Sequence, residues 1–143
     1  FNARLGYPLS RAEWVAARRA AMTPFDEMLS LVAVLKAHRP IALLTNNDRL
    51  LAATLDDVFP ALRPLFHPHV YVSAELHLAK PDPAIFLELV ARLKVAPHEA
   101  VFVDDLEENV LGAQSAGLHA IRFTGFDAFR AALRAYDLPL PLT

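Results

Sequence analysis

Apolar residues along this chain alternate between short continuous runs and a helical spacing. Continuous runs at 41–45, 70–73, 100–103 and 118–123 are typical of short, buried strands of a parallel sheet. Between these runs, apolar residues recur every three or four positions. That spacing predicts helices over 11–22, 24–37, 48–57, 83–94, 107–116 and 126–136. The alternation of helix and strand predicts an α/β fold with a mainly parallel sheet and right-handed crossovers.

The predicted helix ends carry recognisable capping residues. Ser10 followed by Glu13 forms the pattern of a capping box at the start of the first helix. Thr23 followed by Pro24 predicts a second start, with Thr23 as the N-cap and Pro24 as the first helical residue. Gly117 is expected in the left-handed position that ends a helix. These signals set the boundaries of the predicted elements.

Three segments stand outside the alternation of helix and strand. Residues 60–69 and 74–83 show no periodicity and are expected to be loops. Residues 1–22 precede the first strand and are expected to form a separate helical subdomain. The chain also begins at Phe1 with residues that start no recognisable element, so we expect the numbering to belong to a fragment.

Composition narrows the class of protein and of partner. The chain has 143 residues, of which 55% are hydrophobic, enough for one folded domain with a core. The net charge is −2 with no long run of either sign, which argues against nucleic acid or a membrane surface as the partner. There is no cysteine, no apolar run of 18 residues and no signal-peptide pattern, so a cytoplasmic location is expected. Nothing in the sequence indicates the oligomeric state.

Two adjacent acids, Asp104 and Asp105, follow the predicted strand 100–103 directly. Open α/β sheets bind their ligands at the carboxyl ends of the strands. Neighbouring carboxylates repel each other, and a hard divalent cation such as Mg²⁺ is the ligand that compensates them best. Asn109, one helical turn on, can return its side chain toward the same place. The alternative interpretation is a pair of solvated turn aspartates.

Thr45, Asn46 and Lys80 are further candidates for a site at that edge. Thr45 and Asn46 end the strand 41–45, where a hydroxyl and an amide before a helix N-terminus can bind phosphate oxygens. Lys80 is followed by Pro-Asp-Pro, which stiffens its loop and fixes the ammonium better than in most lysines. Alternatively, Thr45 and Asn46 only cap the next helix, and Lys80 is a solvated loop residue.

Three segments in order carry a resemblance that the single residues do not. The segments LLTNN (43–47), AKPDPAIF (79–86) and VFVDDLEENVLGAQSAGL (101–118) resemble the second, third and fourth motifs of the haloacid dehalogenase-like (HAD) hydrolase superfamily. The similarity covers about residues 25–125 and is to the branch with a helical cap inserted early in the chain. It implies a Rossmann-like parallel sheet flanked by helices over 23–143, with residues 1–22 as the remnant of the cap.

The resemblance also implies roles for the candidate residues. Thr45 and Asn46 would bind the transferring phosphoryl group, and Lys80 would stabilise charge on the nucleophile and the phosphate. Asp105 would hold Mg²⁺ with the assistance of Asp104. The substrate would be a small phosphorylated metabolite, for which a sugar phosphate is a guess by analogy.

The fourth motif favours one branch of the family over another. True 2-haloacid dehalogenases need no metal and typically carry Ser-Ser-Asn where this chain has Asp104-Asp105-Leu106. The acidic pair therefore favours a Mg²⁺-dependent phosphoric monoester hydrolase, with a dehalogenase-type hydrolase as an alternative.

One motif of the family is missing from the sequence. The first motif, Asp-x-Asp, supplies the nucleophile that forms an aspartyl-phosphate, and it does not occur in this chain. In the family its strand is central, between those that match 41–45 and 100–103. We therefore expect an incomplete core that lacks its first strand, a chain that is inactive as given, and weak or no binding of Mg²⁺. A non-catalytic module that binds phosphate and Mg²⁺ is the second hypothesis. A receiver-type signalling domain is disfavoured because the acids come late in the chain.

Overall fold

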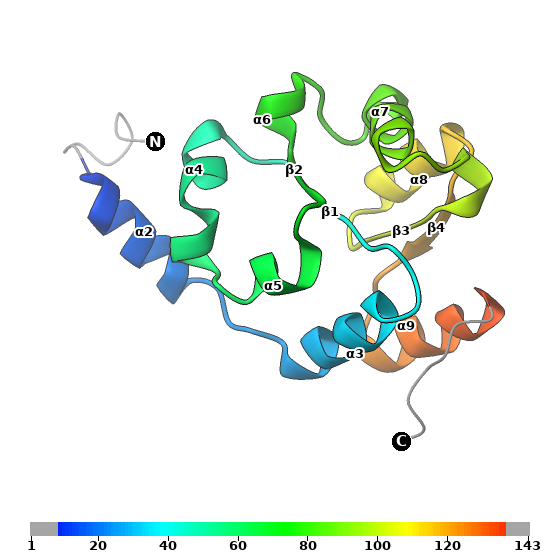
Figure 1. Cartoon of the computed structure of the whole chain (residues 1–143), viewed down its shortest axis with the longest axis horizontal. Helices are drawn as coiled ribbons and strands as arrows, with labels where there is room; N and C mark the ends of the chain where they lie inside the picture. Colours follow the sequence, from blue (N-terminus) through cyan, green and yellow to red (C-terminus); the bar gives the residue numbers. More distant parts are fainter. Residues whose placement is uncertain (1–8, 137–143) are drawn as a thin grey trace.

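The computed structural model of the protein describes residues 9–136 as an α/β arrangement of short strands and flanking helices (Figure 1). The strands are β1 (Leu43–Thr45), β2 (Val70–Val72), β3 (Val101–Asp104) and β4 (His119–Arg122). The helices are α2 (Arg11–Ala20), α3 (Asp26–Lys36), α4 (Arg49–Val58), α5 (Leu62–Phe66), α6 (Ser73–Leu76), α7 (Pro83–Leu93), α8 (Glu107–Ser115) and α9 (Phe126–Leu133). Two 3₁₀ turns, Pro97–Glu99 and Arg134–Tyr136, complete the described elements. The predicted α/β fold with parallel strands is thus confirmed.

The four strands form two separate parallel pairs. In one pair β1 lies beside β2, with Leu44 opposite Tyr71. In the other pair β3 lies beside β4, with Val103 opposite Ile121. Across residues 9–136 no ladder joins β1 to β3, so each of these strands is an edge strand of its own pair.

Helices cover both faces of the β3–β4 pair (Figure 1). On one face, α7 and α8 pack against the strands through the largest buried cluster, in which Phe86 is fully buried and meets Phe102 edge to face. On the other face, α3 and α9 pack through Leu31, Phe129 and their neighbours. Leu44 of β1 belongs to the first cluster, which therefore spans the two strand pairs and holds them together.

A third cluster packs α2 and α4 against the β1–β2 pair. Its buried members are Leu51, Leu55 and Val58 of α4, and Trp14 and Val15 of α2 lie against them. The helix α2 itself buries no residue completely. The assignment of residues 1–22 to a cap remnant and 23–143 to a core stays a prediction, and residues 1–8 lie outside the described part.

Several predicted helix ends are confirmed by hydrogen bonds. The Ser10 hydroxyl accepts from the Glu13 N–H at 3.2 Å, and the Glu13 carboxylate accepts from the Ser10 N–H at 2.8 Å, which completes the capping box. Gly117 adopts a φ of +87°, as expected for a residue that ends a helix in the left-handed region. Local side-chain chemistry therefore defines these boundaries.

The predicted helix start at Thr23 and Pro24 is wrong. The helix α3 begins at Asp26, and Phe25 occupies the N-cap position without a side-chain hydrogen bond. The Phe25 ring lies 5.5 Å from that of Phe126 on α9, centre to centre. This long-range contact accompanies the extended backbone of Phe25 and replaces the predicted local cap.

The two predicted loops each contain a short helix. Within 60–69 the chain forms α5, whose Leu62 packs against the third cluster, and Pro64 is tolerated there because it lies in the first turn. Within 74–83 the chain first completes α6, whose C-cap residue His77 has a φ of 55°. Neither helix has enough residues to show an apolar period. None of the helices within residues 9–136 is long and apolar enough to cross a membrane.

Candidate active site

Asp104 is the last residue of β3 and the most highly connected acid of the candidate site. Its Oδ1 accepts from the Leu106 N–H at 3.0 Å and from the Asn109 amide at 2.9 Å. Its Oδ2 accepts from the Lys80 ammonium at 2.5 Å. The predicted return of Asn109 toward the strand end is therefore observed. Three donors hold the carboxylate in one orientation.

Lys80 and Asp104 form a buried ion pair, because their side chains are only 10% and 7% exposed. The same ammonium lies 3.5 Å from the carbonyl oxygen of Leu44 and 5.5 Å from the centre of the Phe102 ring. Lys80 thus bridges the carboxyl ends of β1 and β3, the two edge strands that do not pair with each other. The structure brings this lysine and this acid together, as the motif order predicted.

The pKa of Asp104 lies below its ordinary value. Burial raises this pKa, but the hydrogen bonds from Lys80, Asn109 and the Leu106 N–H, together with the charge of Lys80, lower it by more. Asp104 is therefore ionised in the folded protein at neutral pH.

Asn46 holds the backbone of Lys80. Its amide nitrogen donates to the Lys80 carbonyl at 2.8 Å, and its amide oxygen accepts from the Lys80 N–H at 3.0 Å. A further restraint comes from α8, where a Cβ added to Gly112 would lie 2.0 Å from the Pro81 carbonyl oxygen. The loop that carries Lys80 is thus fixed from both sides.

Thr45 ends β1 in a small polar network. Its hydroxyl accepts from the Asn47 amide at 2.5 Å, and the Asn47 N–H donates to the Ser73 hydroxyl at 3.1 Å. The Asn47 amide oxygen in turn accepts from the Arg18 guanidinium at 3.4 Å. The end of β1 is therefore connected to α6 and, through Arg18, to α2.

Asp105 differs from Asp104 in its surroundings. Asp105 is exposed, and its carboxylate makes no hydrogen bond or ion pair within residues 9–136. No group of three or more His, Cys, Asp or Glu residues in this part of the chain is placed to hold a metal ion. The donor set fits Mg²⁺ only in part. Asp105 is available as a ligand, whereas both oxygens of Asp104 already accept hydrogen bonds from the protein.

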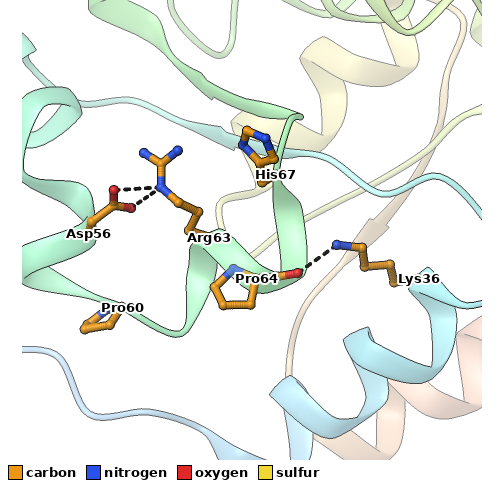
Figure 2. Close-up of a pocket in the computed structure, with 6 residues that line it drawn as sticks. All are labelled: Lys36, Asp56, Pro60, Arg63, Pro64 and His67. Carbon is orange, nitrogen blue, oxygen red and sulfur yellow. Dashed lines mark hydrogen bonds and ion pairs between the residues drawn. The ribbon is translucent and has the colours of Figure 1, made fainter.

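A pocket in the described part of the chain lies elsewhere (Figure 2). Its volume is about 600 Å³, and it is lined by Lys36, Asp56, Pro60, Arg63, Pro64 and His67. Figure 2 shows Arg63 paired with Asp56, and Lys36 donating to the Pro64 carbonyl at 2.7 Å. Lys36 precedes β1 and His67 precedes β2, so the pocket lies toward the amino ends of these strands. Its polar groups therefore take no part in the cluster around Lys80 and Asp104.

Four residues of the candidate site were not predicted from the sequence: Arg18, Asn47, Ser73 and Gly112. Gly112 has a usable signal, because a glycine in the middle of a predicted helix often marks a close backbone contact. Arg18 lies in a helical pattern whose charges are typical of a solvated face. Its partner Asn47 is 29 positions away, so no local pattern predicts this contact.

Comparisons with known proteins identify relatives of this chain. The chain is 43% identical over 58 residues to a glyceraldehyde 3-phosphate phosphatase from Methanopyrus kandleri, covering 40% of this chain and 25% of that protein. It is 34% identical over 88 residues to a phosphoserine phosphatase from Thermus thermophilus, covering 57% and 32% respectively. The chain therefore spans a third or less of the length of these two relatives.

A solved structure extends the likeness to the fold. It is that of a HAD family enzyme from Bacteroides thetaiotaomicron, an aspartate-to-alanine variant in complex with magnesium and inorganic phosphate. The identity is 26% and the TM-score 0.70, with 85% of this chain and 65% of that chain covered. The sequence model of the family described as haloacid dehalogenase-like hydrolase matches residues 4–117, most of the chain. This chain therefore belongs to the haloacid dehalogenase-like hydrolase family.

Proposed function

We propose that the complete protein containing this chain is a Mg²⁺-dependent phosphoric monoester hydrolase that acts on a small phosphorylated metabolite. The observation that carries the proposal is the buried pair of Lys80 and Asp104 at the carboxyl ends of β1 and β3, where the ammonium also reaches the carbonyl of Leu44, the residue before Thr45. A fixed cation at the end of the strand that carries the Thr45 hydroxyl suits a phosphoryl group, whose oxygens carry the charge. The phosphatases among the relatives support the same reaction class.

The residues of this chain take distinct roles in the proposal. The Thr45 hydroxyl and the Lys80 ammonium bind oxygens of the transferring phosphoryl group. Asn46, whose amide is bonded to the Lys80 backbone, positions that ammonium and so contributes to phosphate binding indirectly. Asp104 holds the Lys80 ammonium in place.

Asp105 would hold Mg²⁺, with Asp104 behind it, and the ion would shield the charge of the phosphate. The nucleophile would be an aspartate on a strand that this sequence lacks. The bond from phosphorus to the substrate oxygen would break as the bond to that aspartate forms, and water would then hydrolyse the aspartyl-phosphate. We therefore expect the chain by itself to be inactive.

A direct test measures hydrolysis of p-nitrophenyl phosphate by the product of the complete reading frame that contains these residues. We expect turnover with Mg²⁺ and loss of turnover after chelation, whereas the 143-residue chain alone gives none. Lys80→Met should abolish turnover, and Lys94→Met, at an exposed lysine after α7, should preserve it. Absence of turnover by a product that includes Asp-x-Asp would contradict the proposal and favour the non-catalytic binding module.

A further inference from the structure

The Arg18 side chain extends from α2 and places its guanidinium near the end of β1. Its Nη2 lies 3.4 Å from the Asn47 amide oxygen, a long hydrogen bond, and its guanidinium carbon lies 5.8 Å from the centre of the Trp14 ring. The Nε atom is buried and has no hydrogen-bond partner among residues 9–136. An unpaired buried donor is costly, and the cost is greater for a charged group. The guanidinium therefore has donor capacity that the protein does not use.

The position of Arg18 separates it from the proposed phosphoryl site. The Asn47 amide lies between them, because its oxygen accepts from Arg18 while its nitrogen donates to Thr45. Lys80 has its own anionic partner in Asp104. By contrast, no carboxylate within residues 9–136 forms an ion pair with Arg18. The cation is thus unneutralised and stands one side chain away from the phosphoryl cradle.

The helix that carries Arg18 is held in place. Arg11 donates to the Ala53 carbonyl of α4 at 3.0 Å, and Trp14 and Val15 pack against the third cluster. A cation on a docked helix costs less ordering on binding than one on a mobile loop. This arrangement favours a role for Arg18 in ligand recognition, because a docked helix holds the cation in one place.

We propose that Arg18 is a specificity-determining residue that binds a second anionic group of the substrate, either a carboxylate or a second phosphate. Both groups accept the paired N–H donors of a guanidinium. The inference rests on the proposed function, since it places the transferring phosphoryl group at Thr45 and Lys80. It assigns the substrate to phosphomonoesters that carry another anion at the far end.

The test compares kcat/KM for two matched substrate pairs in the product of the complete reading frame. The second group is a carboxylate in 3-phosphoglycerate and a hydroxymethyl group in glycerol 3-phosphate. In the second pair, this group is a phosphate in fructose 1,6-bisphosphate and a hydroxyl in fructose 6-phosphate. For the doubly anionic member of at least one pair, Arg18→Gln should lower kcat/KM about tenfold or more, mainly through KM. For its singly anionic partner the change should stay below about threefold, and the responding pair identifies the second anion.

Two further variants separate recognition from structure. Arg18→Lys keeps a cation and should recover part of the selectivity. Arg19→Gln changes the exposed neighbour on the same helix and should leave all four values unchanged. Equal losses on both members of each pair, or no preference of the parent enzyme for either doubly anionic substrate, would overturn the assignment of Arg18 while leaving the proposed function intact. Failure of the parent enzyme to hydrolyse any phosphomonoester, including p-nitrophenyl phosphate, would overturn both.

Discussion

At the scale of single residues, the Lys80–Asp104 pair has the largest expected effect on stability. Both side chains are buried, and removing one partner of such a pair leaves an uncompensated charge in the interior. Lys80→Met should lower the free energy of unfolding by about 3 kcal/mol. The loss stays near the lower end of the usual range because Asp104 keeps two other donors. Urea unfolding of the 143-residue chain measures this difference.

Arg92 provides a matched control for that measurement. It pairs with Glu88 one turn earlier on α7, but the two side chains are 49% and 41% exposed. Arg92→Met should cost no more than about 0.5 kcal/mol. If Lys80→Met were no more destabilising than Arg92→Met, the buried pair would not contribute as the structure indicates.

The lowered pKa of Asp104 gives the stability a defined pH dependence. In the unfolded chain an aspartate has a pKa of about 3.9, and in the folded protein the pKa of Asp104 lies below its ordinary value. Its stabilising contribution is therefore complete above the unfolded pKa and disappears as the pH falls through the folded one. The parent chain should lose stability below about pH 4, and Asp104→Asn should show a shallower decline.

The comparison requires unfolding curves at several pH values for both proteins. Asp105→Asn serves as the control, because Asp105 is exposed and has no partner in the described part of the chain. This variant should keep the acid dependence of the parent. Equal declines for the parent and Asp104→Asn would show that other acids cause the pH dependence.

At the scale of elements, the contact between α8 and the Lys80 loop depends on Gly112. A Cβ at this position would meet the Pro81 carbonyl oxygen at 2.0 Å, so α8 or the loop must move if a methyl group is added. Gly112→Ala should cost about 2 kcal/mol or more, although alanine is the better helix former. Unfolding in urea measures the cost, with Gln114→Ala on the exposed side of α8 as the control. A stabilising Gly112→Ala would contradict the close contact.

Local sequence signals correctly predicted those helix ends that are set by neighbouring residues. The capping box of Ser10 and Glu13, and the left-handed Gly117, are of this kind. The start of α3 differs because Phe25 meets Phe126, about one hundred positions away in the sequence. Long-range packing of this type leaves no mark in a window of a few residues.

The sequence predicted which residues form the candidate site better than it predicted how their side chains are arranged. Motif order predicted Thr45, Asn46, Lys80 and Asp104 at one edge of the sheet. Hydrogen bonds join Asn46 to Lys80 and Lys80 to Asp104, whereas Thr45 bonds to Asn47. The sequence did not predict that the Asn46 side chain would bind the Lys80 backbone. An amide can serve a ligand or a loop equally well, and only the position of Lys80 decides between them.

At the scale of the whole molecule, the packing falls into parts of unequal strength. The third cluster has three buried residues on α4, and α2 adds no fully buried side chain. The single tryptophan, Trp14, lies in α2. Its fluorescence should therefore change at a lower urea concentration than the far-ultraviolet circular dichroism, which follows all helices. Coincident transitions would show that α2 unfolds together with the rest.

The division of the strands into two pairs has a consequence for the behaviour of the protein in solution. Within residues 9–136, both β1 and β3 leave one side of their backbone without a strand neighbour, and neither strand contains proline or lysine. Such edges are templates on which another extended polypeptide can assemble. Val103, 36% exposed on β3, adds apolar surface to one of them. Higher protein concentration should therefore favour intermolecular strand pairing and precipitation over the monomer.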